Sequence, residues 1–365
     1  PWNLWAYSTT SLNEIIQIVN IIGLYSYNLI LITFFTFPII FLFKISNVKK
    51  IITFFSIFLT ILSLYIYGNY EINKNEKRLN SANQRIFIKV VSPNFDLEYG
   101  LNQKEIENRF NKIIRYSEPN KDKKTIFVWP EGIFSGYSFK EISIFKDLIT
   151  NNFSNKHHII FGVNRLDPES GNFYNSMLLV DSNFEIIQSY NKRKLVPFGE
   201  FLPFENLLNK FGIKKITEGY GSFLKGGDNN NLLLNNLRIL PLICYEVIFT
   251  HLIQKSNIDT NLVVNISEDG WFGKTIGPDQ HFSKSIFRAI ENGTFFIRSA
   301  NKGVSAIIDN KGNIIKQLNR NEAGNLEFEV PLIKSNKIKN DLIFFVLLIT
   351  YLLVFLFYRG KNAKK

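Results

Sequence analysis

The chain has little of the chemistry that most proteins use for cross-links and metal sites. Its 365 residues contain one cysteine, Cys244, and four histidines. One cysteine excludes an internal disulfide. The histidines at 157, 158, 251 and 281 show no metal-ligand spacing with Cys244, so we expect no metal site and no cofactor. Such a thiol is either an inert buried side chain or a reactive group, and the residues around it determine which of the two it is.

Initiator and signal sequences are also missing. The only methionine is Met177 and the chain starts at Pro1, so we expect it to begin inside a longer polypeptide. The N-terminal residues contain no basic region, and no cleavage site of small residues follows a short apolar core. Both observations argue against a cleavable signal peptide. The composition, 45% hydrophobic and 15% aromatic, favours a folded chain with a sizeable core over a disordered one.

Three long runs carry no charge, over 15–43, 51–70 and 342–358. A membrane-spanning helix needs roughly 17 to 25 mostly apolar residues, whereas the alternative, a buried core helix, is usually shorter. We therefore predict a membrane region over 1–70 with helices at about 22–43 and 51–70. A third spanning helix is predicted over 342–358, and part of the first run can form a separate or interfacial element.

Basic residues flank these runs. The loop Lys44–Lys50 holds three lysines, and the tail 359–365 holds four basic residues. The excess of positive charge on cytoplasmic loops predicts that both face the cytoplasm and that 71–341 lies on the opposite side of the membrane. These seven residues supply much of the formal net charge of +12, so the basic composition does not predict nucleic-acid binding.

The segment 71–341 alternates β-rich runs with amphipathic stretches, which is typical of an α/β domain. Nine strands are predicted, at Arg85–Val91, Thr125–Trp129, His158–Val163, Ser176–Val180, Glu185–Tyr190, Leu237–Ile243, Leu262–Ile266, Phe295–Ala300 and Val304–Asp309. Helices are predicted over 103–116, 140–150, 246–256 and 279–292, the last ending at Gly293. An Asp-Ser-Asn turn at 181–183 predicts a hairpin between two of the strands.

Dense polar sequences follow four of these strands. They are Phe127-Val-Trp-Pro-Glu131, the stretch Tyr190–Glu200, Ile243-Cys-Tyr-Glu246, and the stretch Asn265–Gly273. Loops at one end of a sheet usually assemble the site of an α/β protein, so we expect these four ends to converge.

A nucleophilic thiol needs a base and a positive charge nearby, because a thiol with an ordinary pKa is mostly protonated at neutral pH. Glu131 can act as the base, since partial burial behind Trp129 should raise its pKa. Lys192 can stabilise the oxyanion of a tetrahedral intermediate, together with the backbone N–H of Tyr245. In isolation Glu131 is compatible with a helix cap and Lys192 with a solvated charge. With Cys244 they predict a catalytic site.

The polar strings resemble those of the nitrilase, or carbon-nitrogen hydrolase, superfamily, and within it they are similar to the apolipoprotein N-acyltransferases. The matching strings are Val128-Trp-Pro-Glu131, Tyr190-Asn-Lys192, Leu195-Val-Pro-Phe-Gly-Glu200, Ile243-Cys-Tyr-Glu246, Asp269-Gly-Trp-Phe-Gly273, Ile276-Gly-Pro278, Gln280-His-Phe282 and Arg298-Ser-Ala-Asn-Lys-Gly303. The resemblance runs from Pro1 to the tail. Members of that family have further membrane-spanning helices before the position that corresponds to Pro1. We therefore expect this chain to be an N-terminally truncated fragment.

The resemblance implies an αββα sandwich attached to transmembrane helices. It implies a triad with a general base, a transition-state stabiliser and a nucleophile, at Glu131, Lys192 and Cys244 respectively. Supporting positions are implied at Glu200, Tyr245 and Glu246. It further implies a phospholipid acyl donor, a diacylglyceryl apolipoprotein as acceptor, and a monomer in the bacterial inner membrane with its catalytic domain in the periplasm.

An apolar stripe and then several glycines follow Glu200. The stripe comprises Phe201, Leu202, Phe204, Leu207, Leu208 and Phe211, and the glycines are Gly219, Gly221, Gly226 and Gly227. This pattern fits a mobile arm at the entrance of an active site that faces the membrane. It fits equally well a helix that packs on the core of the domain.

Two other functions remain open at this point. A membrane-anchored amidase would use the same three residues with water as the second nucleophile. An inactive envelope scaffold would only bind lipoproteins or another partner, although intact Glu131, Lys192 and Cys244 argue against it.

Overall fold

Two six-stranded sheets form the centre of the computed structural model, which describes residues 2–212, 221–227, 231–254, 259–335 and 341–362. The first sheet has the order β12-β1-β2-β3-β4-β5 and the second β11-β10-β9-β8-β7-β6. The bounds in the first are β1 (Arg85–Ser92), β2 (Thr125–Val128), β3 (His157–Leu166), β4 (Phe173–Val180), β5 (Ile186–Asn191) and β12 (Gly324–Pro331). In the second they are β6 (Leu232–Leu234), β7 (Leu237–Ile243), β8 (Leu262–Glu268), β9 (Phe295–Asn301), β10 (Ser305–Ile308) and β11 (Ile314–Leu318).

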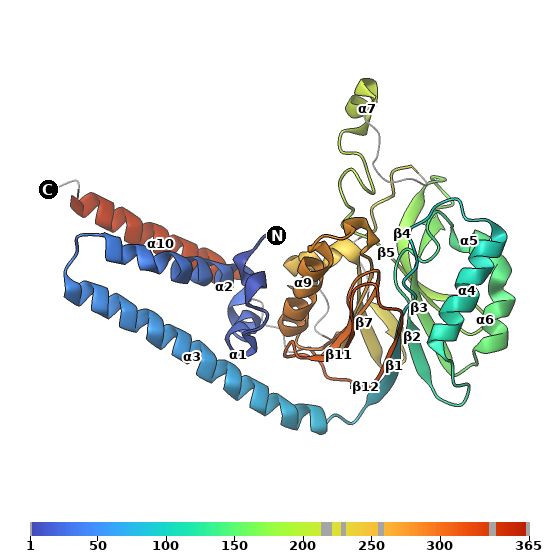
Figure 1. The fold of residues 1–365 in the computed structure, drawn as a ribbon, viewed down its shortest axis with the longest axis horizontal. Coiled ribbons are helices and arrows are strands. Elements are labelled where there is room, and N and C mark those ends of the chain that lie inside the picture. Colours follow the sequence, from blue (N-terminus) through green and yellow to red (C-terminus); the bar gives the residue numbers. More distant parts are fainter. Residues whose placement is uncertain (1, 213–220, 228–230, 255–258, 336–340, 363–365) are drawn as a thin grey trace.

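The alternation of side chains along each strand explains the layers. In β2, Ile126 and Val128 face the other sheet, whereas Phe127 faces the helices outside. The first sheet is covered by α4 (Gln103–Ser117), α5 (Phe139–Ile142) and α6 (Lys146–Asn152), and the second by α8 (Thr250–Gln254) and α9 (Gly277–Asn292). Figure 1 shows these helices on the two outer faces. The predicted αββα sandwich is confirmed.

All nine predicted strands form, with ends shifted by up to three residues. The 181–183 turn joins β4 to β5 in the predicted antiparallel hairpin. The helix predicted over 140–150 is divided into α5, a 3-10 turn η3 (Ser143–Phe145) and α6. The helix predicted from Glu246 starts as a 3-10 turn, η5 (Cys244–Ile248), and continues as α8, while 255–256 lie outside the described residues.

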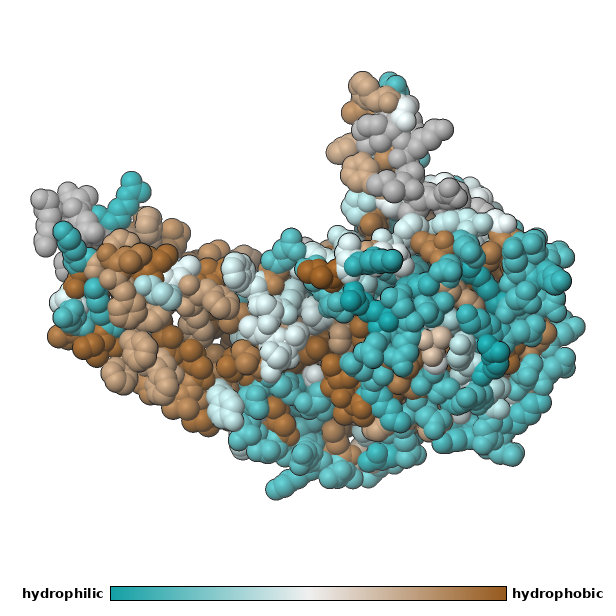
Figure 2. Space-filling view, in the orientation of Figure 1, coloured by the Kyte–Doolittle hydropathy of each residue, from teal (hydrophilic) through white to brown (hydrophobic). Residues whose placement is uncertain are grey.

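Apolar helices extend from this sandwich. They are α2 (Val19–Thr36), continued by η2 (Phe37–Leu42), then α3 (Asn47–Asn80) and α10 (Asp341–Asn362). Val19–Leu42 and Asn47–Asn80 are long and apolar enough to cross a membrane, and Leu342–Phe357 is a shorter apolar helix. Figure 2 shows hydrophobic residues along this part of the surface. The C-terminal turns of α3 contact the sandwich, where Glu71 pairs with Lys311 at 2.8 Å and the Asn75 amide donates to Asn310 at 2.9 Å.

The residues before α3 also contact the sandwich directly. The segment comprises η1 (Trp5–Thr9), α1 (Asn13–Ile16) and the first turns of α2, and it joins the core that α9 forms outside the second sheet. Tyr7 and Tyr27 place their rings 5.3 and 6.4 Å from the ring of Phe287. The N-terminal segment is therefore part of the packed outer layer of the sandwich as well as the start of a candidate membrane-spanning helix.

Replacing Phe287 by alanine should destabilise the chain by about 3 to 5 kcal/mol, because the cavity would open between α9 and the N-terminal segment. The thermal unfolding midpoint in detergent should fall well below that of Ile144→Ala, a control at a side chain that is 61% exposed. Equal midpoints for the two variants would show that the segment does not contribute to the core.

Candidate active site

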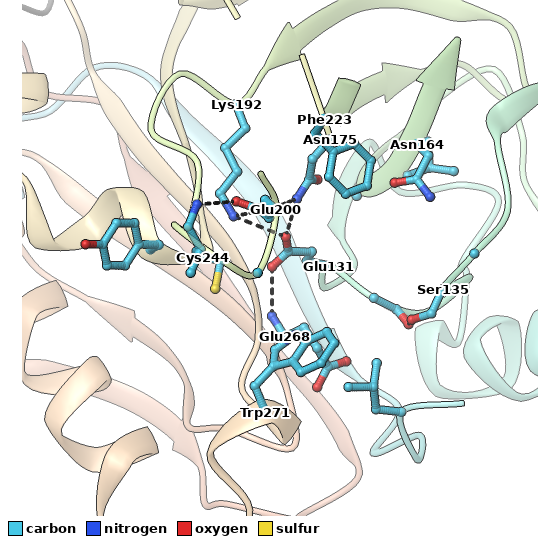
Figure 3. A pocket seen from close by; sticks show the side chains of 18 of the residues that line it. Glu131, Ser135, Asn164, Asn175, Lys192, Glu200, Phe223, Cys244, Glu268 and Trp271 are labelled. Atoms are coloured by element: carbon cyan, nitrogen blue, oxygen red, sulfur yellow. Dashed lines mark hydrogen bonds and ion pairs between the residues drawn. The ribbon is translucent and has the colours of Figure 1, made fainter. Parts of the chain in front are cut away.

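Four strand ends converge on one cavity, as predicted. Glu131 follows β2, Lys192 follows β5, Cys244 follows β7 and Glu268 ends β8. All four line a cavity of about 460 Å³. Figure 3 shows the sulfur of Cys244 on the same side of this cavity as the carboxylate of Glu131 and the ammonium of Lys192. The two sheets thus bring together residues that lie up to 137 positions apart in the sequence, from Glu131 to Glu268.

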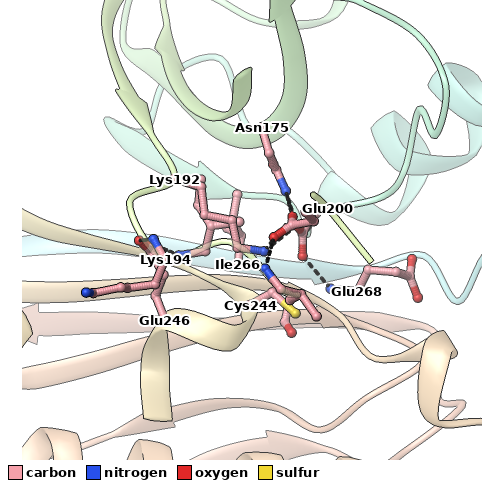
Figure 4. A network of polar contacts seen from close by, with 12 residues as sticks. Asn175, Lys192, Lys194, Glu200, Cys244, Glu246, Ile266 and Glu268 are labelled. Atoms are coloured by element: carbon pink, nitrogen blue, oxygen red, sulfur yellow. Dashed lines mark hydrogen bonds and ion pairs between the residues drawn. The ribbon is translucent and has the colours of Figure 1, made fainter. Parts of the chain in front are cut away.

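A buried ammonium lies between two carboxylates. Lys192 Nζ donates to Glu200 Oε1 at 2.8 Å and is 3.6 Å from Glu131 Oε1. Asn175 Nδ2 donates to both of those oxygens, at 2.7 Å each. The other oxygen of Glu131 accepts from the backbone N–H of Glu268 at 3.0 Å. These contacts, drawn in Figures 3 and 4, hold the Glu131 carboxylate in a single orientation.

Burial and charge set the protonation states. Burial alone would lower the pKa of Lys192, but the carboxylates of Glu200 and Glu131 raise it above its usual value. Burial raises the pKa of Glu131, against the opposing effect of Lys192. Burial and the charge of Glu131 also raise the pKa of the Cys244 thiol. A thiol with a raised pKa is neutral at rest, which suits proton transfer to Glu131 during attack and not a preformed thiolate.

Alkylation of Cys244 by iodoacetamide should keep accelerating above about pH 9, because a raised pKa delays formation of the reactive thiolate. In Glu131→Gln the acceleration should occur at lower pH, since a negative charge beside the thiol is lost. Alkylation rates of the wild type and of Glu131→Gln, measured by mass spectrometry across the pH range, test both expectations. A plateau already below pH 7 would instead demonstrate a stable thiolate.

The backbone at Cys244 is held in an uncommon conformation. Its φ is +46°, in the left-handed region, where strand β7 turns into η5. The buried carboxylate of Glu246 stabilises this turn by accepting from the N–H groups of Ile243, Arg193 and Lys194. It also accepts from the Tyr190 hydroxyl at 2.8 Å. Glu246 thereby ties the loop after β5, which carries Lys192, to the loop that carries Cys244.

The three supporting residues predicted from the sequence occupy different places. Glu200 and Tyr245 line the cavity, whereas Glu246 lies behind it. Sequence reasoning did not identify Asn175 or Glu268 as site residues. Asn175 is the third residue of β4 and belongs to no polar motif of its own. Glu268 lies within the polar stretch Asn265–Gly273, and its place in that stretch is the feature of the sequence from which it could have been identified as a site residue.

Glu268 adds a second acid next to Glu131. Burial raises its pKa to about 8. Its side chain accepts from the Gly270 N–H and the Asn301 amide, at 2.7 Å each. The neighbouring Gly132 has φ +77°, and a Cβ there would come within 2.5 Å of the Glu268 carboxyl, so only glycine fits.

The rest of the cavity wall is largely apolar. Its apolar residues come from several loops and from the N-terminal segment, and they are Trp2, Leu97, Tyr99, Phe134, Val163, Val196, Pro197, Phe223, Trp271 and Phe272. Trp2 is held by stacking on His281 and by its N–H, which donates to the Gln280 side chain at 3.1 Å. A polar reaction centre at the base of an apolar wall suits a substrate with a long hydrocarbon part.

Metal ligands do not gather at this site. No group of three or more His, Cys, Asp or Glu that could hold a metal ion occurs among the described residues.

The apolar stripe after Glu200 stands away from the sheets. Figure 1 shows α7 (Glu205–Leu208) projecting from the domain. Phe204, Leu207 and Phe211 are 83%, 55% and 73% exposed, whereas Leu202 is buried. The alternative of a helix packed on the core is therefore wrong for the outer part of the stripe. Gly219 lies outside the described residues.

Comparisons with known proteins agree with this geometry. A family model for carbon-nitrogen hydrolases matches residues 99–339. Apolipoprotein N-acyltransferase of Rickettsia prowazekii is 31% identical over 98% of this chain, and that of Rhodopseudomonas palustris 30% identical over 91%. The chain spans 73% of the first relative's length and 64%, slightly under two thirds, of the second's.

Solved structures show the same fold. Saccharomyces cerevisiae Nit3, a nitrilase-superfamily member, matches with a TM-score of 0.50 and 16% identity, over 68% of this chain and 91% of its own. A carbon-nitrogen hydrolase from Helicobacter pylori matches with a TM-score of 0.50 and 15% identity, over 68% of this chain and 89% of its own. The chain belongs to the carbon-nitrogen hydrolase family and, within it, to the apolipoprotein N-acyltransferases.

Proposed function

We propose that this chain carries the catalytic domain that transfers an acyl group from a phospholipid, through Cys244, to the α-amino group of a diacylglyceryl cysteine on an apolipoprotein. The observation that carries the proposal is the cavity itself. Glu131, Lys192 and Cys244 meet at its polar end, and an apolar wall continues into the segment that leads to the candidate membrane helices. A lipid donor could enter from the membrane and present its ester to the thiol.

In the first half-reaction the Cys244 sulfur attacks the ester carbonyl carbon, and Glu131 takes the thiol proton. The carbonyl electron pair moves onto oxygen, where the ammonium of Lys192 stabilises the negative charge. When the intermediate collapses, the carbon–oxygen bond breaks, and Glu131 returns the proton to the departing lysophospholipid. The products are a thioester on Cys244 and a free lysophospholipid.

In the second half-reaction the acceptor amine attacks the thioester carbonyl. Glu131 removes a proton from the nitrogen, and the same oxyanion forms beside Lys192. Collapse breaks the carbon–sulfur bond and leaves an amide on the lipoprotein. The thiol recovers its proton from Glu131. The enzyme thus needs no bound cofactor in either step.

The membrane arrangement completes the proposal. Residues 1–70 and 342–358 would anchor the domain 71–341 to the outer leaflet of the bacterial inner membrane, with the tail 359–365 in the cytoplasm and the domain in the periplasm. The basic loop Lys44–Lys50 and the apolar helices support this orientation. The exposed stripe around α7 would contact lipid at the mouth of the cavity.

The fate of the acyl chain distinguishes acyl transfer from hydrolysis. The full-length protein in phospholipid vesicles with labelled acyl chains would be mixed with a diacylglyceryl lipopeptide. We expect the label on the lipopeptide amine and a matching amount of lysophospholipid. Label appearing only as free fatty acid would support a hydrolase, and no release of lysophospholipid would support a scaffold without activity.

Replacing Trp2 by alanine should lower kcat/KM for a long-chain donor by about tenfold, because part of the apolar wall is lost. The loss should be smaller for a short-chain ester that does not reach Trp2. Leu166→Ala, at a side chain that is 42% exposed and outside the cavity, serves as control. An equal loss for both donors would place Trp2 outside the acyl-binding region.

A further inference from the structure

A buried polar network lies behind the nucleophile, on the side of the second sheet. His281, on α9, is fully buried and places Nε2 3.2 Å from the backbone oxygen of Cys244. Its other ring nitrogen is 2.8 Å from Asp269 Oδ1. Arg298 Nη2 donates to Asp269 Oδ2 at 2.7 Å, and Ser267 Oγ donates to Asp269 Oδ1 at 2.7 Å. Burial lowers the pKa of His281, so the neutral ring carries a single N–H. Arg298 Nη2 also lies 3.1 Å from Nδ1, which can therefore accept from the guanidinium while Nε2 donates to the Cys244 oxygen, and the ring is held on both sides.

The contact with Cys244 defines what the ring does. A carbonyl oxygen can only accept, so His281 Nε2 carries the hydrogen and donates it. The ring binds the backbone oxygen and not the sulfur, which distinguishes it from a general base for the thiol. Trp2 stacks on the imidazole with ring centroids 5.6 Å apart, and both side chains line the cavity.

Anchoring this oxygen also fixes the next N–H group. The peptide bond between Cys244 and Tyr245 is trans, so its C=O and N–H point in opposite directions. With the oxygen held toward His281, the N–H of Tyr245 points away from it. Because Tyr245 is the second residue of η5, this N–H has no acceptor inside that helical turn. Tyr245 also lines the cavity.

We propose that His281 is a positioning residue, which holds the carbonyl of Cys244 so that the N–H of Tyr245 is aimed at the oxyanion formed when Cys244 is acylated. The left-handed φ of +46° at Cys244 is then maintained by two anchors, His281 on its carbonyl and Glu246 on the preceding N–H of Ile243. The inference rests on the proposed function, since only attack on a carbonyl generates the oxyanion.

Two reactions of the same thiol separate this role from a structural one. Acylation by a labelled phospholipid passes through an oxyanion, whereas alkylation by iodoacetamide does not. In the full-length protein, His281→Ala should lower the acylation rate about 100- to 1,000-fold, as for loss of an oxyanion donor. Its alkylation rate at the same pH should stay at the wild-type value. His281→Gln, whose amide can donate to the carbonyl, should recover part of the acylation rate.

The control is Ser285→Ala, at a buried position one turn further along α9 whose hydroxyl has no hydrogen-bond partner within the described part of the chain. It should acylate normally. If His281→Ala loses acylation and alkylation in parallel, or acylates at the wild-type rate, the role of His281 is wrong, while the proposed function still stands. A wild-type protein that is alkylated but never acylated would contradict the proposed function as well.

Discussion

Replacing Cys244 by alanine is expected to lower acyl transfer by about a millionfold, to the background level, as removal of a catalytic nucleophile does in other enzymes. Both half-reactions need the sulfur, first to attack the ester and then to hold the acyl group. Cys244→Ser should retain at most traces, because the hydroxyl is a far weaker acid than the thiol and Glu131 cannot activate it equally. Release of lysophospholipid and formation of amide should stop together.

The thermal unfolding midpoint of Cys244→Ala serves as the control, because it shows whether the variant still folds. Cys244 is only partly buried as a residue and packs at the edge of the inter-sheet core, so alanine should change stability little. A variant that folds normally but still forms the amide product would require a different nucleophile.

Replacing Lys192 by methionine should lower the rate at least about a thousandfold, because the oxyanion loses its cation. A second effect adds to the first. Glu131 and Glu200, which share the amide of Asn175, would face each other without the ammonium between them. The pKa of Glu131 would then rise further, and the protonated carboxyl could not accept the thiol proton. Breaking this buried pair should also cost about 3 to 5 kcal/mol of stability.

Lys194→Met is the matched control, two residues along the same loop. Its backbone N–H still donates to Glu246, and its side chain lies over the ring of Phe249 instead of between carboxylates. Single-turnover acylation and thermal unfolding of both variants would be compared. Similar rates in the two variants would mean that charge anywhere on this loop suffices, against the role assigned to Lys192.

Much of the sandwich could be predicted because its strands carry an alternating or continuously apolar pattern. The strands that were missed show the limits. β6 has three residues, too few for a periodic signal, and β11 has its side chains mostly exposed. In β12 the alternation of Leu326, Phe328 and Val330 was present in the sequence, but the charged residues between them obscured it.

The site residues that were predicted are those whose chemistry is visible from their own neighbours. Glu131, Lys192 and Cys244 each follow a strand, and the structure brings them to one cavity. Glu200 was also identified, whereas Asn175, Glu268 and Trp2 contribute only through three-dimensional contacts. Trp2 reaches the cavity because the N-terminal segment folds back on α9, a long-range packing that no local pattern encodes. His281 was considered as a metal ligand and stood in the matching string Gln280-His-Phe282, but its contact with a backbone oxygen has no sequence signal.

The central claim is that Cys244 holds the acyl chain as a thioester. The most direct test is to incubate the full-length protein with labelled phospholipid without acceptor, digest it, and locate the label by mass spectrometry. We predict one acyl group on the peptide that contains Cys244, removed by hydroxylamine and transferred to a lipopeptide amine on later addition. Lysophospholipid release with no adduct on Cys244, or an adduct on another residue that is competent for transfer, would contradict the account.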